Sequence, residues 1–271
     1  MAAPKDVYFK AYDGTTLGGT VHSGGEARPT LIMTQGFSGL KDFFNKKWTA
    51  LWQAEGFTVF WYDHRFWGAS GGEPRNEVDP AMQTRDLFDA FSFAQTLPDV
   101  DPDNIFYWGN SMAAGNSIMA ASINKAVAGV IAQQGKSELL PIFPETLEEL
   151  ESGTYMALFQ TRESFEASKT FECQGHWEKK ATFQSILNCM LHDPKAFIHR
   201  VSPVPLLMIA TTQDVTSPVK MQVEAFDLAK EPKTLHVFEG YGHYDLWYGE
   251  ALKRNFDVQL EWVKKSCRQK K

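Results

Sequence analysis

The sequence lacks the features that mark membrane, nucleic-acid-binding and disulfide-stabilised proteins. No stretch of about 18 apolar residues occurs, and the first residues contain no apolar core of a signal peptide. The net charge is −6, with 27 basic and 33 acidic residues, so no basic patch for nucleic acid is expected. Only three cysteines are present. We therefore expect a soluble, cytoplasmic protein with no membrane or nucleic-acid partner and no disulfide framework.

Motifs for cofactors and metals are scarce as well. No dinucleotide-binding or P-loop fingerprint is present, so we predict no cofactor. Cys173 and His176 form a Cys-x-x-His pair, but no second pair at zinc spacing accompanies it. We therefore predict no metal.

The sequence does contain a regular alternation of strand-like and helix-like segments. A leading hairpin and six further strands are predicted at 7–11, 16–21, 29–34, 58–62, 105–109, 126–132, 204–210 and 234–238. Helices are predicted at about 42–55 and 79–97, directly after residue 111, up to about 230, and near the end of the sequence. This alternation predicts an α/β fold with a mainly parallel sheet of about eight strands and helices on both faces.

One interval breaks the alternation. Residues 136–202 carry no strand signal but contain helix-like runs at 145–150, 156–159 and 183–191. An insertion of this length between two strands predicts a helical lid over the cleft, within a single domain that spans 1–271. The alternative is an ordinary packing elaboration away from the cleft.

The stretch 105–115 has the pattern of a nucleophile elbow. A buried strand-like run ends at Gly109, and Ser111 is followed by small residues that suit the start of a helix. Such a turn forces the residue at its tip into a strained conformation, which lifts the serine Oγ into a cleft. Gly109 and Ala113 are small, as the close approach of backbone at the turn requires. The alternative is a serine that only caps the helix beginning at Met112.

Two residues that follow later strands can complete a triad with this serine. A nucleophilic serine needs a base, and the base needs an orienting acid. Asp214 and His243 come after successive strands, so the carboxyl ends of the parallel strands place both at the edge that carries Ser111. The joint placement makes Ser111, Asp214 and His243 the predicted catalytic residues.

Other acids compete with Asp214. Asp245 is too close in sequence to His243 to orient the far side of its ring. Asp63 is expected instead to form an ion pair with Arg65 that braces the glycine-rich loop at 63–75.

Backbone amides and aromatic side chains complete the predicted site. Residues 35–39 form a glycine loop after a strand, and the N–H groups of Phe37 and Met112 are the predicted oxyanion hole. Aromatic residues are frequent in the loops around the cleft. They predict an apolar acyl pocket, with these side chains in it: Phe66, Trp67, Tyr244 and Trp247.

Taken together, these motifs resemble the α/β-hydrolase superfamily over nearly the whole chain. The segments that carry the resemblance are 35–37, 63–75, 109–113, 213–214 and 242–245, in the order in which the superfamily has them. The Ser-Gly-Gly-Glu-Pro-Arg loop and the lid are similar to the dienelactone-hydrolase-like branch, which includes fungal thiohydrolases, polyketide transferases and thioesterase-type cyclases. The chain departs from the common pattern at three positions, where His, Gly and Gly are usual: Gln35, Phe66 and Ala113.

The resemblance implies a serine-dependent acyl hydrolase or acyltransferase. Its implied substrate is a polyketide acyl thioester on a carrier protein of a polyketide synthase, released by hydrolysis, by transfer or by lactone formation. Two alternatives stay open: a small-molecule carboxylesterase or lactonase with the same triad, and a non-catalytic ligand-binding protein on the same fold.

Overall fold

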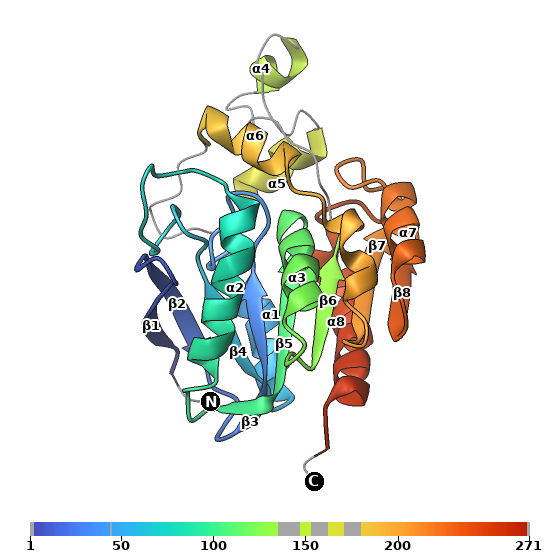
Figure 1. Cartoon of the computed structure of the whole chain (residues 1–271). Helices are drawn as coiled ribbons and strands as arrows, with labels where there is room; N and C mark the ends of the chain where they lie inside the picture. The colour runs from blue at the N-terminus through green and yellow to red at the C-terminus, as the bar shows by residue number, and fades with distance from the viewer. Residues whose placement is uncertain (1–2, 44, 135–146, 153–161, 171–179, 270–271) are drawn as a thin grey trace.

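Figure 1 shows the computed structural model of the chain, which describes residues 3–43, 45–134, 147–152, 162–170 and 180–269. The strands are β1 (Lys5–Lys10), β2 (Thr16–His22), β3 (Arg28–Thr34), β4 (Thr58–Tyr62), β5 (Val100–Asn110), β6 (Gly129–Gln133), β7 (Leu206–Thr211) and β8 (Lys233–Phe238). The α-helices are α1 (Asn45–Ala54), α2 (Pro80–Ala94), α3 (Met112–Ile123), α4 (Leu147–Ser152), α5 (Arg162–Thr170), α6 (Phe183–Met190), α7 (Val219–Leu228) and α8 (Gly249–Ser266). Short 3-10 turns are η1 (Pro194–Ala196), η2 (Ile198–Arg200) and η3 (Asp245–Trp247).

The strands form one sheet in the order β1-β2-β4-β3-β5-β6-β7-β8. β1 and β2 pair antiparallel as the predicted hairpin, β2 runs antiparallel to β4, and all the remaining neighbours are parallel. The prediction of a mainly parallel sheet of about eight strands is confirmed. Because parallel strands end at the same edge, the loops after β3, β5, β7 and β8 meet above that edge.

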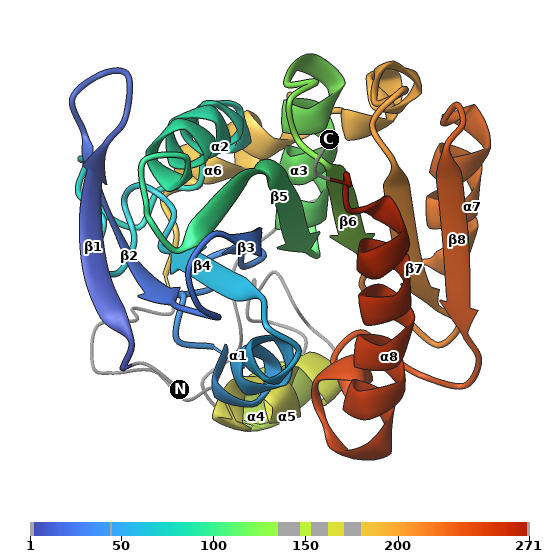
Figure 2. The same cartoon turned by 90° about the horizontal axis from the view of Figure 1, so that it is seen from below.

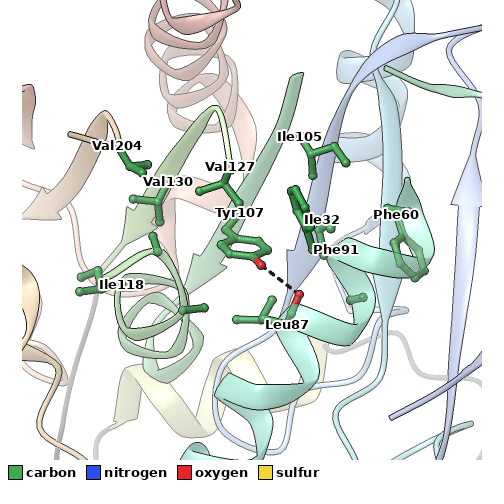
Figure 3. Close-up of a cluster of buried hydrophobic side chains, with 14 of the residues drawn as sticks. Ile32, Phe60, Leu87, Phe91, Ile105, Tyr107, Ile118, Val127, Val130 and Val204 are labelled. Carbon is green, nitrogen blue, oxygen red and sulfur yellow. Dashed lines mark hydrogen bonds between the residues drawn. The ribbon is translucent and has the colours of Figure 1, made fainter. Parts of the chain in front are cut away.

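Helices cover both faces of the sheet. Figure 2 shows α1 and α8 on one face and α2, α3 and α7 on the other. Each layer encloses its own hydrophobic core. On the α2 and α3 side, Leu87 and Phe91 of α2 pack toward Ile105 and Tyr107 of β5, and Tyr107 Oη donates a hydrogen bond to the Leu87 carbonyl oxygen at 3.0 Å (Figure 3). The opposite core contains five buried tryptophans: Trp48, Trp52, Trp61, Trp108 and Trp247.

The boundaries of α2 follow from local chemistry. The side chain of Asp79 accepts a hydrogen bond from the Met82 N–H, and Pro80 occupies the first turn, where its missing N–H costs nothing. The helix ends at Ala94, before Pro98. The signals at the start are visible in the sequence, and the predicted start at 79 agrees with the structure, whereas the predicted end at 97 lies three residues too late.

The strand that carries the elbow is longer than predicted. β5 begins at Val100, where a lead-in loop was expected before Ile105. Arg28 pairs with Val100 and Thr30 with Ile105, so four residues of β5 bulge out against a single residue of β3. Pro102 lies in this bulge, where its lack of an N–H removes no ladder hydrogen bond.

The insertion between β6 and β7 is helical wherever the structure describes it. It contains α4, α5, α6 and the turns η1 and η2, and Figure 1 shows α5 and α6 above the edge at which β5 and β6 end. The helix-like run at 156–159 lies outside the described residues, and α5 was not predicted. That the insertion acts as a lid remains a prediction. Within the described ranges, no helix combines the length and apolar character needed to cross a membrane.

Candidate active site

Ser111 occupies a sharp turn between β5 and α3. Its backbone has φ 49° and ψ −125°, in the left-handed region that L-residues rarely adopt. An added Cβ at Gly109 would overlap the Ala113 carbonyl oxygen and lie 2.7 Å from Ser117 Oγ, so only glycine fits there. Although Ser111 stands at the N-cap position of α3, its side chain makes no capping hydrogen bond. A capping role therefore does not explain this serine.

Asp214 and His243 meet in a buried hydrogen bond. The Nδ1 atom of His243 lies 2.7 Å from Asp214 Oδ2, and both residues are only 4% exposed. The other carboxylate oxygen, Oδ1, accepts the Ser217 N–H at 2.6 Å, which fixes the carboxylate after β7. With Nδ1 engaged by the carboxylate, Nε2 is the ring nitrogen left for a proton acceptor.

Asp245 and Asp63, the two other candidates for the acid of the triad, form hydrogen bonds elsewhere. Asp245 Oδ2 accepts the Gly242 N–H at 2.7 Å, so it shapes the loop of His243. The expected ion pair between Asp63 and Arg65 is wrong. The Asp63 carboxylate accepts the N–H groups of Lys41 (2.6 Å) and Ala69 (2.8 Å), and its burial raises its pKa to about 6.

Arg65 instead forms ion pairs with two carboxylates from other elements. Its guanidinium meets both oxygens of the buried Asp86 on α2, and its Nη1 lies 2.7 Å from Asp13 Oδ2. A planar guanidinium pairs well with both oxygens of one carboxylate. This pairing supplies hydrogen bonds to the Asp86 carboxylate, which is fully buried, whereas that of Asp13 is not. The sequence could not distinguish these partners, because Asp13 and Asp86 are close to Arg65 only in space.

The loop after β3 lies against the nucleophile. A Cβ added to Gly36 would sit 2.8 Å from Ser111 Cβ and 3.4 Å from Ser111 Oγ. The N–H groups of Phe37 and Met112, which are the predicted oxyanion donors, have no acceptor among the described residues. Unused amide donors beside a serine Oγ are the arrangement that binds an oxyanion.

Gln35 braces this loop at the position where the superfamily often has histidine. The side-chain Nε2 of Gln35 donates to the Phe43 carbonyl oxygen at 2.6 Å. The main-chain carbonyl oxygen of Gln35 lies 3.0 Å from His64 Nε2. Burial lowers the pKa of His64 to about 4, so its ring is neutral near pH 7 and can donate to that carbonyl.

The described residues contain no group of three or more side chains able to hold a metal ion. Cys173 and His176 lie outside the described residues. Burial raises the pKa of the Cys189 thiol to about 12, so it stays protonated.

Sequence and structure comparisons identify relatives along the whole chain, although no family model matches it. A polyketide transferase of Stachybotrys chlorohalonatus is 30% identical, over 96% of this chain and 97% of the relative. A thiohydrolase of Eupenicillium brefeldianum is 29% identical, over 97% and 95%. The crystal structure of the α/β hydrolase GrgF from Penicillium sp. sh18 matches with a TM-score of 0.85 at 26% identity, over 98% of this chain and 99% of that one. The chain belongs to this α/β-hydrolase family.

The resemblance seen in the sequence is therefore confirmed, and the chain is an enzyme of the hydrolase or acyltransferase type. The structure of DcsB in complex with a substrate analogue supports the fold, with a TM-score of 0.87 at 24% identity.

The four aromatic residues predicted to line the acyl pocket lie in three different places. Phe66 and Trp67 pack in one apolar cluster with Met112 of the elbow and Cys189 of α6. Phe66 has φ 72°, which explains why the superfamily often has glycine at this position. Trp247 packs in the core on the α1 and α8 side. The Tyr244 ring lies 4.9 Å from the His243 ring, at 80° to it.

Two glutamines at the end of β6 join the parts of the site, and sequence analysis missed both. The main-chain carbonyl oxygen of Gln133 accepts a hydrogen bond from the Ser111 N–H at 2.8 Å. Gln134 Nε2 donates to the Gly242 carbonyl oxygen at 3.1 Å and lies 3.2 Å from Thr211 Oγ1. The elbow, the end of β7 and the loop of His243 are thus tied to one dipeptide. Consecutive amides that end a buried strand are the signal that could have revealed them.

A buried amide network supports Gln133 from below. Its Oε1 accepts hydrogen bonds from Asn255 Nδ2 (2.9 Å) and Gln259 Nε2 (3.0 Å), both on α8. Gln259 Oε1 in turn accepts the indole N–H of Trp108 on β5 at 2.7 Å. Helix α8 thereby holds β5 and β6 together just below Ser111.

Proposed function

We propose that the hydrolase forms an acyl-enzyme on Ser111 with a polyketide acyl thioester and passes the acyl group to water, to an external acceptor or to a hydroxyl of the chain itself. One observation carries this proposal. The buried 2.7 Å contact of His243 with Asp214 lies at the same edge of the sheet as Ser111, whose backbone is strained and whose side chain does not cap α3. The polyketide substrate class rests on the names of the relatives, a polyketide transferase and a thiohydrolase.

The reaction follows from the roles of these groups. His243 accepts the Ser111 hydroxyl proton through Nε2 while Oγ attacks the acyl carbonyl carbon, and Asp214 stabilises the imidazolium. The N–H groups of Phe37 and Met112 bind the oxyanion. Collapse breaks the carbon–sulfur bond, and the thiol leaves with the proton from His243. An acceptor hydroxyl then loses its proton to His243 and attacks the ester, and His243 returns this proton to Ser111 Oγ as the bond between Oγ and the acyl carbon breaks.

The apolar cluster beside the elbow is the proposed wall for the acyl chain. Met112 follows the nucleophile directly, and it packs with Phe66, Trp67 and Cys189. Tyr244, whose ring lies 4.9 Å from the His243 ring, is the other aromatic residue of the proposed pocket beside a triad member. A carrier protein that delivers the thioester is the proposed partner.

Intact-protein mass spectrometry tests this function. Wild type and Ser111→Ala are mixed with a panel of acyl N-acetylcysteamine thioesters, and the small-molecule products are analysed in parallel. We expect a serine-dependent acyl adduct, with free acid, ester or lactone appearing as it decays.

Two other results would each refute part of the proposal. Turnover of simple esters with none of the thioesters would indicate a carboxylesterase or lactonase. No adduct and no product from folded protein, with a ligand that raises the melting temperature and emerges unchanged, would indicate a binding protein.

A further inference from the structure

The first turn of α5, in the insertion, contacts the loop of His243. The Tyr244 N–H donates a hydrogen bond to Glu163 Oε1, with a nitrogen–oxygen distance of 3.4 Å. An added Cβ at Gly242 would overlap Glu163 Oε1 and lie 3.0 Å from its Cδ. The carboxylate therefore occupies the space that the glycine leaves open, against Gly242 and Tyr244 of the loop.

The next residue of α5 reaches the other side of the same loop. Ser164 is fully buried, and its hydroxyl is hydrogen-bonded to that of Tyr244. The Tyr244 ring in turn stands edge-on to the His243 ring. Two neighbouring residues of one helix thus hold the backbone of His243 and the aromatic ring that packs against its imidazole.

The surroundings of Glu163 raise the pKa of its carboxyl group overall. Burial raises the pKa of its carboxyl group, while the Tyr244 N–H, the charge of His243 and the His243 N–H act in the opposite direction. The charge of Asp214 also raises its pKa. Carboxyl groups with perturbed pKa values are frequent at functional sites.

We propose that Glu163 and Ser164 are positioning residues, through which the helical insertion sets the orientation of His243 toward Ser111. This inference rests on the proposed serine mechanism. It means that the insertion contributes to the chemical step, and not only to substrate binding.

The rate at which a fluorophosphonate probe labels Ser111 tests the proposal, because labelling needs a correctly placed base but no knowledge of the natural substrate. Glu163→Ala should label about tenfold more slowly, since it removes the acceptor of the Tyr244 N–H and the side chain that packs against Gly242. Glu163→Gln keeps an acceptor oxygen and should recover much of the rate. Ser164→Ala should slow labelling less than Glu163→Ala.

Glu166→Ala is the matched control. Glu166 lies on the same helix, and among the described residues its carboxylate binds only the exposed side chain of Arg162, at 2.9 Å. This variant should label at the wild-type rate, and melting temperatures show whether each variant is folded.

The far-downfield proton resonance of the His243–Asp214 hydrogen bond gives a readout that does not depend on reactivity. It should shift or broaden in Glu163→Ala and stay unchanged in Glu166→Ala. If Glu163→Ala keeps both the wild-type labelling rate and this resonance, the positioning role is refuted. If wild type itself is not labelled, the serine mechanism fails, and the resonance alone still decides whether Glu163 orients His243.

Discussion

Gly36→Ala provides a sharp test of how closely the loop after β3 approaches the nucleophile. The backbone of Gly36 lies outside the left-handed region, so alanine is not strained by its own φ. Its Cβ would, however, lie 2.8 Å from Ser111 Cβ, whereas ordinary contact begins at 3.4 Å. The loop must therefore move by about 3.4 − 2.8 = 0.6 Å, and it carries the Phe37 N–H with it.

A shift of this size weakens one of the two proposed oxyanion donors and disturbs Ser111. Loss of such a donor typically lowers kcat by about 10²–10³, and misplacement of about 1 Å costs about 10². We expect kcat/KM to fall about a hundredfold with the acyl N-acetylcysteamine thioester that wild type turns over fastest. Gly36 is itself buried, so the melting temperature of the variant is measured together with its activity, and the two proteins are compared at a temperature at which both are folded.

Gly71→Ala is a suitable control, because its new Cβ would come no closer than 3.3 Å to a neighbour, the Thr16 carbonyl oxygen. It should keep nearly full activity. If Gly36→Ala retains at least a third of the wild-type kcat/KM at an unchanged melting temperature, the proposed oxyanion loop is wrong.

Three further predictions concern the acid, a buried ion pair and a buried histidine. Asp214→Asn leaves the fold intact but deprives His243 of its anion, so kcat should fall by about 10⁴ in stopped-flow turnover assays; a fall below tenfold would exclude Asp214 as the orienting acid. Arg65→Ala leaves Asp86 buried without its partner and should lower the free energy of unfolding in urea by about 3–5 kcal/mol; a loss below about 1 kcal/mol would contradict the burial of this pair. Burial lowers the pKa of His192 to about 4, below its unfolded value near 6.5, so its contribution to stability is present above pH 6.5 and is lost as the pH falls through 4. Urea melts of His192→Gln should depend less steeply on pH across this window, and parallel curves for the two proteins would argue against the assignment.

The sheet, its helices and the order of the site residues along the chain could be predicted from the sequence, because hydrophobic periodicity and turn residues encode local structure. The start of α2 is an example, since Asp79 and Pro80 both act on adjacent backbone. The strained turn at Ser111 was also readable, since Gly109 and Ala113 leave few alternatives.

The partners of polar side chains could not be predicted, because they depend on distant elements. Nothing in the stretch 63–65 indicates that Asp63 binds loop amides while Arg65 binds Asp86, 21 residues further on. Helix α5 was missed because its sequence, Arg-Glu-Ser-Phe-Glu-Ala-Ser-Lys-Thr, has few apolar residues and only one face that packs. The contact of Glu163 with the loop of His243 was therefore also beyond sequence analysis.

The amide network below Ser111 has a consequence for when the protein acquires activity during synthesis. Asn255 and Gln259 lie 122 and 126 residues after Gln133, and Gln259 lies 151 residues after Trp108. A ribosome adds about 5–20 residues per second, so the elbow is made several seconds before its support. Until α8 packs against the sheet, the side-chain oxygen of Gln133 and the indole N–H of Trp108 lack these hydrogen-bond partners. Burying the two groups without partners is unfavourable. A nascent chain that already contains Ser111 thus lacks the support of the turn that carries it until α8 has been made.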